Sequence, residues 1–200
     1  MDIPFSQACE NNKRPILTIL SSALAHTTKV LEIGSGTGQH AAFFGQHLDH
    51  LTWQTSDLVI NHAGINAWLA ETPADNVKAP LAIDLNEPDA IAQYQLNFDA
   101  IFTANTLHII SWPLVVKFFQ AIAKNLPSKG VVCIYGPFKY NGEFTSDSNA
   151  DFDLRLKDRD INSGIRDFEA ILQLAQESGL SLIDDHKMPA NNQLLVFNKQ

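Results

Sequence analysis

The stretch Val30-Leu31-Glu32-Ile33-Gly34-Ser35-Gly36-Thr37-Gly38-Gln39-His40 decides the fold of this chain. Aliphatic and β-branched residues over 29–33 predict a short buried strand, and three glycines follow it directly. Glycine lets the backbone turn tightly and approach a ligand, and the helix expected next offers unpaired N–H groups at its N-terminus. The stretch therefore predicts a strand–turn–helix unit that binds a nucleotide-like ligand over residues 34–38.

The spacing of the glycines restricts the kind of ligand. The dinucleotide fingerprint GxGxxG needs glycine at position 39, where this chain has Gln39, and the phosphate-loop ending GK[ST] is absent. The ligand therefore need not carry a pyrophosphate. The alternative is a glycine-rich turn that binds nothing, and both the acid Glu32 just before the turn and the strand–helix context speak against it.

The alternation of strand and helix continues along the chain. An opening helix is expected from Pro15, because apolar residues recur after it at three- and four-residue steps. Further elements are expected as strands at 51–56, 81–84, 98–103 and 130–135 and as helices at 41–48, 61–71, 88–94 and 113–125. Right-handed crossovers between such strands predict an α/β, doubly wound parallel sheet with helices on both faces.

The C-terminal part of the chain follows a different pattern. A helix is expected over 167–178, then strands over 180–184 and 194–198. About nine residues separate these strands, which leaves no room for a crossover helix, so they should pair as an antiparallel hairpin. The sheet is therefore expected to end in a reversed strand.

Composition narrows the class of protein. The chain has 200 residues and 22.1 kDa, so we expect a single domain over 1–200. Its formal net charge of -8 opposes binding to a phosphate backbone, and a nucleic-acid partner is disfavoured. With no membrane-spanning stretch and no signal peptide, a soluble cytoplasmic protein is expected. His47 and His50 have no evident third ligand nearby, so no metal is assigned.

Two acids at predicted strand ends are candidates for holding the ligand. Asp57 lies nineteen residues beyond Gly38, where a carboxylate can accept hydrogen bonds from ribose hydroxyls; alternatively it caps the next helix. Asp84 ends the third strand, where a carboxylate can read the adenine amine while Leu85 packs on the ring; alternatively it is a turn residue.

Reactive groups are expected after the strand at 98–103. Asn105 and His108 follow it at the carboxyl edge, where doubly wound sheets place such groups. Of the seven histidines, His108 is the best placed for proton transfer. The alternative for His108 is a hydrogen bond that only orders its loop.

Six stretches of the chain resemble one family. They are residues 8–13 (ACENNK), 31–40 (LEIGSGTGQH), 53–57 (WQTSD), 104–109 (ANTLHI), 135–139 (YGPFK) and 188–192 (MPANN). The chain resembles the class I S-adenosylmethionine-dependent methyltransferases. Within them it is similar to a poorly characterised bacterial family whose eukaryotic relatives are called methyltransferase-like protein 26.

The resemblance implies a seven-stranded Rossmann-like sheet ordered 3-2-1-4-5-7-6 with the last strand antiparallel. It implies S-adenosyl-L-methionine as cofactor, with Glu32, Asp57 and Asp84 as its methionine-side, ribose and adenine-side acids. The residues predicted to bind the cofactor are therefore Glu32, Gly34, Ser35, Gly36, Thr37, Gly38, Asp57, Asp84, Leu85 and Asn105. Thr55 and Thr106 depart from what relatives often show, which leaves the shape of the pocket open.

We therefore interpret the chain as a methyltransferase that acts on an unidentified small molecule or protein side chain. His108, Asn105 and Tyr135 are its candidate catalytic residues, Tyr135 because an aromatic face favours a sulfonium. The alternatives are a non-catalytic S-adenosylmethionine-binding module and a nicotinamide-dependent oxidoreductase. Residues 137–166 are expected to form an inserted substrate lid, because ordinary connections in such folds are far shorter. Asn149, Asp153 and Arg166 are expected to bring polar groups toward the methyl donor. The alternative is an insertion that only covers a sheet edge.

Overall fold

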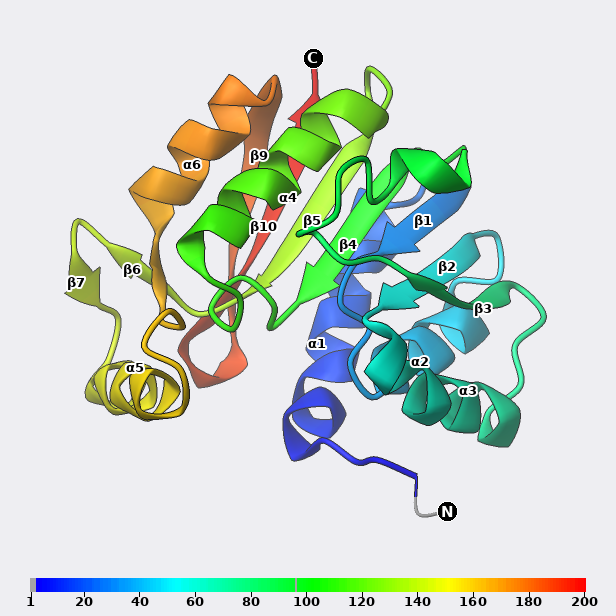
Figure 1. The fold of residues 1–200 in the computed structure, drawn as a ribbon, viewed down its shortest axis with the longest axis horizontal. Coiled ribbons are helices and arrows are strands. Elements are labelled where there is room, and N and C mark those ends of the chain that lie inside the picture. The colour runs from blue at the N-terminus through cyan, green and yellow to red at the C-terminus, as the bar shows by residue number, and fades with distance from the viewer. Residues whose placement is uncertain (1–2, 96) are drawn as a thin grey trace.

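A seven-stranded sheet runs through the molecule (Figure 1). The computed structural model describes residues 3–95 and 97–200. The sheet consists of β1 (Lys29–Glu32), β2 (Thr52–Asp57), β3 (Val77–Ala82), β4 (Ala100–Ala104), β5 (Val131–Gly136), β9 (Leu180–Met188) and β10 (Asn192–Lys199). Its strand order is β3-β2-β1-β4-β5-β10-β9, and β10 runs antiparallel to the other six strands. The predicted order 3-2-1-4-5-7-6 with a reversed last strand is confirmed.

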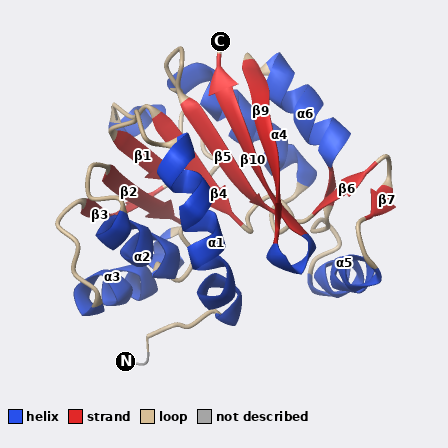
Figure 2. Cartoon of the chain, turned by 180° about the vertical axis from the view of Figure 1, so that it is seen from behind, coloured by secondary structure: helices blue, strands red, loops and turns tan. Residues whose placement is uncertain are grey.

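Helices cover both faces of this sheet, as predicted. One face carries α1 (Gln7–Ala23), α2 (Gln39–His47) and α3 (His62–Glu71), and the other carries α4 (Trp112–Asn125) and α6 (Phe168–Glu177) (Figures 1 and 2). Successive strand residues point to opposite faces. Val30 therefore packs with the α1 and α2 side chains, whereas Leu31 packs with those of α4 and α6.

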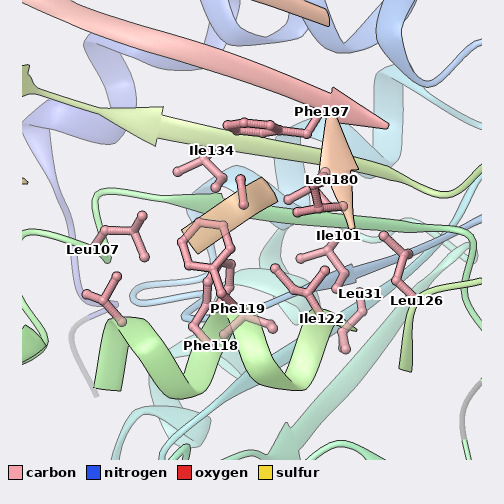
Figure 3. Close-up of a cluster of buried hydrophobic side chains, with 14 of the residues drawn as sticks. Leu31, Ile101, Leu107, Phe118, Phe119, Ile122, Leu126, Ile134, Leu180 and Phe197 are labelled. Carbon is pink, nitrogen blue, oxygen red and sulfur yellow. The ribbon is translucent and has the colours of Figure 1, made fainter. Parts of the chain in front are cut away.

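The face beneath α4 shows why this helix forms where the sequence predicted it. Phe118, Phe119 and Ile122 are fully or almost fully buried and point at the strands, where Ile101 and Ile134 meet them (Figure 3). Full burial of one such side chain contributes about 1.5 to 3 kcal/mol. This core holds the carboxyl ends of β4 and β5 in fixed positions.

Helix α1 begins eight residues earlier than predicted. Ser6 caps it by accepting a hydrogen bond from the Cys9 N–H, and Pro15 lies inside the helix. The prediction was wrong because a proline at a first-turn position is more common than one in a helix interior. The two extra turns carry Ala8, Cys9 and Asn12 to the carboxyl edge of the sheet.

The connection between β3 and β4 contains no α-helix over 88–94 among the described residues. A single 3-10 turn covers Ala92–Tyr94, and the backbone is left-handed at Asp89 (φ 53°) and Gln95 (φ 49°), which breaks any helix. Buried Ala90 and Ile91 cover the sheet there instead. β3 also starts earlier than predicted, at Val77, and ends at Ala82, so Asp84 follows the strand instead of ending it.

The C-terminal hairpin is present, but its strands are longer than predicted. β9 and β10 extend to a turn of three residues, Pro189–Asn191. The charged stretch 184–187 hid this extension, because β9 is an edge strand whose polar residues remain solvated.

Residues 137–166 form structure of their own beside the main sheet. The insertion contains β6 (Phe138–Tyr140), β7 (Glu143–Phe144) and α5 (Asp147–Arg159), and β8 (Arg166–Asp167) closes a small sheet in the order β7-β6-β8. Ser146 caps α5 by accepting from the Asn149 N–H. In Figures 1 and 2, α5 lies beyond the carboxyl ends of the parallel strands and covers neither face of the main sheet. No helix in the described part of the chain is long and apolar enough to cross a bilayer.

Candidate active site

A cavity lies at the carboxyl ends of β1, β2 and β4. Its volume of about 690 Å³ is within the range of small-molecule sites. The predicted site residues on its wall are Gly34, Ser35, Gly36, Thr37, Asp57, Asp84, Leu85, Asn105 and His108. We call it the glycine-turn cavity. Most of the predicted ligand-binding residues therefore meet in one place.

The three glycines of the turn have different structural roles. All three are left-handed, with φ of 76° at Gly34, 58° at Gly36 and 91° at Gly38. A Cβ at Gly34 would lie 2.8 Å from the Thr106 Oγ1, and one at Gly38 would lie 2.9 Å from the Cα of Ile65. A Cβ at Gly36 would meet nothing within 4 Å. Gly38 packs against α3 and does not line the cavity, whereas Gly36 faces it.

Asp57 is held rigidly at the end of β2. Its Oδ2 accepts a hydrogen bond from the Gly36 N–H (2.7 Å), and its Oδ1 accepts from the Leu58 N–H (2.7 Å) and the Asn61 side chain (2.7 Å). A carboxylate has about four acceptor positions, so Oδ2 keeps one for a ligand hydroxyl. The bonds to Leu58 and Asn61 show that Asp57 also orders the start of the next helical segment.

Asp84 lies in a turn and faces the same cavity. Its Oδ1 accepts from the backbone N–H of Asn86 (2.8 Å) and from the side chain of Asn86 (3.1 Å). Its Oδ2 has no hydrogen-bond partner among the described residues. The turn role and a ligand-binding role are therefore compatible, because they use different oxygens.

Glu32 lies beneath the glycine turn, outside the cavity wall. It is 1% exposed, and its Oε2 accepts from the Trp53 indole (3.0 Å) and the Ser35 hydroxyl (2.9 Å). Burial raises the pKa of Glu32 to about 7, against the effect of these two hydrogen bonds. Ser35 links this carboxyl group to the cavity, which Ser35 lines.

His108 and Asn105 lie on the loop after β4. Neither ring nitrogen of His108 hydrogen-bonds to a described residue, and the ring meets Phe152 edge-on at 5.5 Å between centroids. Burial, with a smaller effect of the Arg166 charge, lowers the pKa of His108 to about 4. The imidazole is therefore neutral near pH 7 and keeps a free lone pair, while burial makes it a weaker base than an exposed histidine. Asn105 is left-handed at φ 57°.

The last residues of the insertion donate hydrogen bonds to the backbone carbonyls of this loop. The carbonyl oxygens of residues 107–110 accept, in order, from Arg166 Nε (2.9 Å), Gly164 N (2.9 Å), Ser163 Oγ (2.6 Å) and an Arg166 terminal nitrogen. Four consecutive carbonyls are thus paired with residues 163–166. The position of His108 is set by the insertion as well as by β4.

The polar residues of the insertion do not all face the cavities. Asn149 lines the second cavity described below, whereas Asp153 and Arg166 line neither. Asp153 accepts from the Ile165 N–H (2.7 Å) and pairs with Lys157 (2.6 Å). The expectation that Asp153 and Arg166 point toward the ligand was wrong, since both are used to fold the insertion onto the loop at 107–110.

A second cavity of about 320 Å³ adjoins the first. It is lined by Ala8, Asn11, Asn12, Asn105, Tyr135, Pro137, Ser148, Asn149, Phe152, Pro189, Ala190 and Asn192. Ala8, Asn105 and Phe152 line both cavities. We call it the asparagine cavity. Tyr135 lies here and not on the glycine-turn cavity, and the residues from α1 and the β9–β10 turn were missed because no local sequence pattern places them at the site.

Several methyltransferases of solved structure are similar to this chain. An O-methyltransferase family protein from Burkholderia thailandensis matches with a TM-score of 0.80 at 16% identity, over 94% of this chain and 56% of that chain. Human N-acetylserotonin methyltransferase in complex with SAM matches with a TM-score of 0.79 at 12% identity, over 96% and 53%. An O-methyltransferase family 2 protein from Planctomyces limnophilus in complex with apigenin matches with a TM-score of 0.80 at 18% identity, over 96% and 58%.

The chain thus has the Rossmann-like fold of the class I methyltransferases. It spans little more than half the length of those structures. By sequence, residues 3–199 match the profile described as "Protein of unknown function (DUF938)", and the chain belongs to this family.

Proposed function

We propose that this protein binds S-adenosyl-L-methionine in the glycine-turn cavity and transfers its methyl group to a small molecule. The observation that carries this proposal is the arrangement of one cavity wall, on which the open side of Gly36, the carboxylates of Asp57 and Asp84, and neutral His108 share one space. The SAM complex of a structural neighbour supports the choice of cofactor. The relation to methyltransferase-like protein 26 stays a prediction.

The residues of the cavity fit this cofactor. The free acceptor position on Asp57 suits a ribose hydroxyl, and the unpartnered Oδ2 of Asp84 suits the adenine amine, with Leu85 beside the ring. Without a Cβ, Gly36 lets a ligand approach the turn closely. Two carboxylates on the wall also favour a ligand that carries positive charge.

Bound S-adenosylmethionine supplies an electrophilic methyl group on a sulfonium. It would transfer this methyl group to an oxygen or nitrogen of the acceptor, and the sulfur would keep the electron pair of the broken bond. His108 takes the proton that the acceptor loses. Asn105, which lines both cavities, orients the two reactants, and the shared wall holds them in line.

We further propose that residues 137–166 cover both cavities as a lid. Phe152 from α5 lines both cavities, and Arg159 lines the glycine-turn cavity. The amides of α5 should gain protection from hydrogen exchange when S-adenosylhomocysteine and an acceptor are bound together. Protection equal to that of β4 and β5 in both states would mean a static cover.

Calorimetric titration with S-adenosylhomocysteine tests the cofactor assignment. We expect micromolar binding, weakened by about 1.5 to 3 kcal/mol in Asp57→Ala, because a hydrogen bond to a charged group is lost. Asp75→Ala is the matched control, since Asp75 is exposed and far from the cavity wall. Equal affinity in both variants, with the fold intact, would overturn the role of Asp57.

A further inference from the structure

We propose that the asparagine cavity binds the methyl acceptor and that this acceptor is an uncharged aromatic alcohol. The inference rests on the proposed function and adds the place and chemical class of the second substrate. A molecule in each cavity would meet at the shared wall of Ala8, Asn105 and Phe152. His108 lies against Phe152 at this boundary.

The described wall of the asparagine cavity contains no charged side chain, which favours an uncharged molecule. None of the described residues that line the asparagine cavity carries a charge, whereas Asp57, Asp84 and Arg159 line the glycine-turn cavity. A carboxylate or ammonium group transferred here would lose water without gaining a counter-ion. The volume of the asparagine cavity, about 320 Å³, is at the lower end of the range of small-molecule sites, so a small acceptor fits the cavity.

The asparagine side chains of the wall suit a hydroxyl group, which can both donate and accept a hydrogen bond. The oxygens of Asn11 and Asn12 accept from the side chains of Gln7 (2.9 Å) and His40 (2.6 Å), which leaves the amide nitrogens of Asn11 and Asn12 as donors. The amide nitrogen of Asn149 donates to the Thr145 hydroxyl (2.9 Å) and the Asn191 carbonyl (3.0 Å). The amide nitrogen of Asn192 donates to the carbonyls of Pro189 (3.1 Å) and Ala190 (3.2 Å). Both nitrogens are therefore engaged within the protein, and each side chain is left with an oxygen that accepts a hydrogen bond. Hydroxyl groups of a ligand match such oxygens.

The other residues of the wall favour a flat, apolar ring system. Phe152, Pro137 and Pro189 supply ring surfaces, and aromatic faces favour stacked or edge-on contact with another ring. Ala190 is left-handed at φ 57°, as is Asn105 on the shared wall. Strained backbone of this kind clusters at binding sites. An aromatic ring with hydroxyl substituents satisfies both parts of the wall.

The reaction at this site balances as an oxygen methylation. The acceptor oxygen forms a bond to the methyl carbon, the carbon–sulfur bond breaks, and sulfur leaves with the electron pair as a neutral thioether. The hydroxyl proton passes to His108, which is neutral before the transfer, and then to solvent.

The test compares two bicyclic probes of similar size, 2-naphthol and 2-naphthoate. Calorimetry first titrates the protein with S-adenosylhomocysteine and then titrates the saturated protein with each probe. We expect 2-naphthol to bind at least about tenfold more tightly than 2-naphthoate, because only the carboxylate leaves a charge unpaired.

A charge-switch variant locates the probe. Asn11 lies on the exposed side of α1 and lines the asparagine cavity, so Asn11→Lys adds a cation there with little effect on folding. We expect it to bring the affinity for 2-naphthoate up to that for 2-naphthol or above it. Gln173→Lys adds the same charge on α6, away from both cavities, and should leave the preference unchanged.

The outcomes separate this inference from the proposed function. If S-adenosylhomocysteine binds but 2-naphthol does not, or if 2-naphthoate binds as tightly to the unaltered protein, the inference fails and the proposed function stands. Equal effects of the two lysine variants would also overturn it. If S-adenosylhomocysteine does not bind at all, the proposed function fails and the inference with it.

Discussion

The two cavities differ in how the chain builds them. The glycine-turn cavity contains one run of five consecutive residues, 33–37, together with residues that follow β2, β3 and β4. The asparagine cavity is formed by side chains from α1, β5, α5, the loop after β4 and the β9–β10 turn. A continuous turn after the first strand can hold one part of a ligand in a way that many proteins of this fold can share. Where side chains from distant segments form a wall, a single substitution can change which acceptor the wall binds.

The largest expected effect concerns the boundary between the cavities. His108→Ala should lower methyl transfer by about 10²- to 10⁴-fold, because a positioned base contributes on that scale, while affinity for S-adenosylhomocysteine stays the same. Transfer of a labelled methyl group into a cell extract measures it, with exposed His47→Ala as control. Because burial lowers the pKa of His108 to about 4, activity should persist below pH 6 and fall as the pH approaches 4. Equal activity in the two variants would return His108 to a structural role.

The next effect distinguishes two glycines of the same turn. Gly38→Ala should lower the free energy of unfolding by about 2 to 5 kcal/mol, because left-handed strain adds to overlap with the Ile65 backbone. Gly36→Ala should cost only about 1 to 2 kcal/mol, since its Cβ has open space, but should weaken S-adenosylhomocysteine binding more strongly. Urea unfolding and calorimetry measure both. Equal losses of stability would contradict the separate roles.

A pH-dependent effect is expected beneath the turn. Folding raises the pKa of Glu32 from its ordinary 4.5 to about 7. Between pH 4.5 and pH 7, the folded protein therefore binds more protons than the unfolded chain. The stabilising contribution of Glu32 is therefore present below pH 4.5 and is lost as the pH rises through 7. The free energy of unfolding should be measured for Glu32→Gln and for the unaltered protein at pH 4.5 and at pH 8. Between these two pH values, the variant should become more stable relative to the unaltered protein by on the order of 3 kcal/mol. A difference that does not change with pH would place the carboxyl group in a less buried setting.

The smallest expected effect concerns the loop that carries His108. Arg166→Lys keeps the charge but loses the fork that reaches the carbonyls of Leu107 and Ile110, so stability should fall by about 1 to 2 kcal/mol. Hydrogen exchange should quicken over 107–110, and S-adenosylhomocysteine affinity should hold. Arg14→Lys, on the exposed side of α1, is the control. Unaltered exchange in Arg166→Lys would show that β4 alone orders the loop.

The sequence was informative where the site is local. Residues 30–40 predicted the turn, and the ends of the strands placed Asp57, Asp84 and His108 on one wall, because parallel strands bring their carboxyl ends together. Boundaries were less accurate where the backbone breaks a common rule, as at Pro15 inside α1 and the left-handed residue Asp89.

The asparagine cavity could not be predicted from local patterns. Asn12, Asn149 and Asn192 are far apart in sequence, and an asparagine in a helix or turn carries no mark of a shared cavity. The stretches 8–13, 104–109, 135–139 and 188–192, quoted for the resemblance, each contribute to this wall. Only the folded arrangement of α1, α5 and the hairpin turn brings them together.

A crystal structure of the protein with S-adenosylhomocysteine tests the central claim most directly. We expect the ribose to lie on Asp57, the adenine between Asp84 and Leu85, and the sulfur facing Asn105 where the two cavities meet. The ligand in the asparagine cavity, or on a surface without contact to Asp57 and Asp84, would contradict the account.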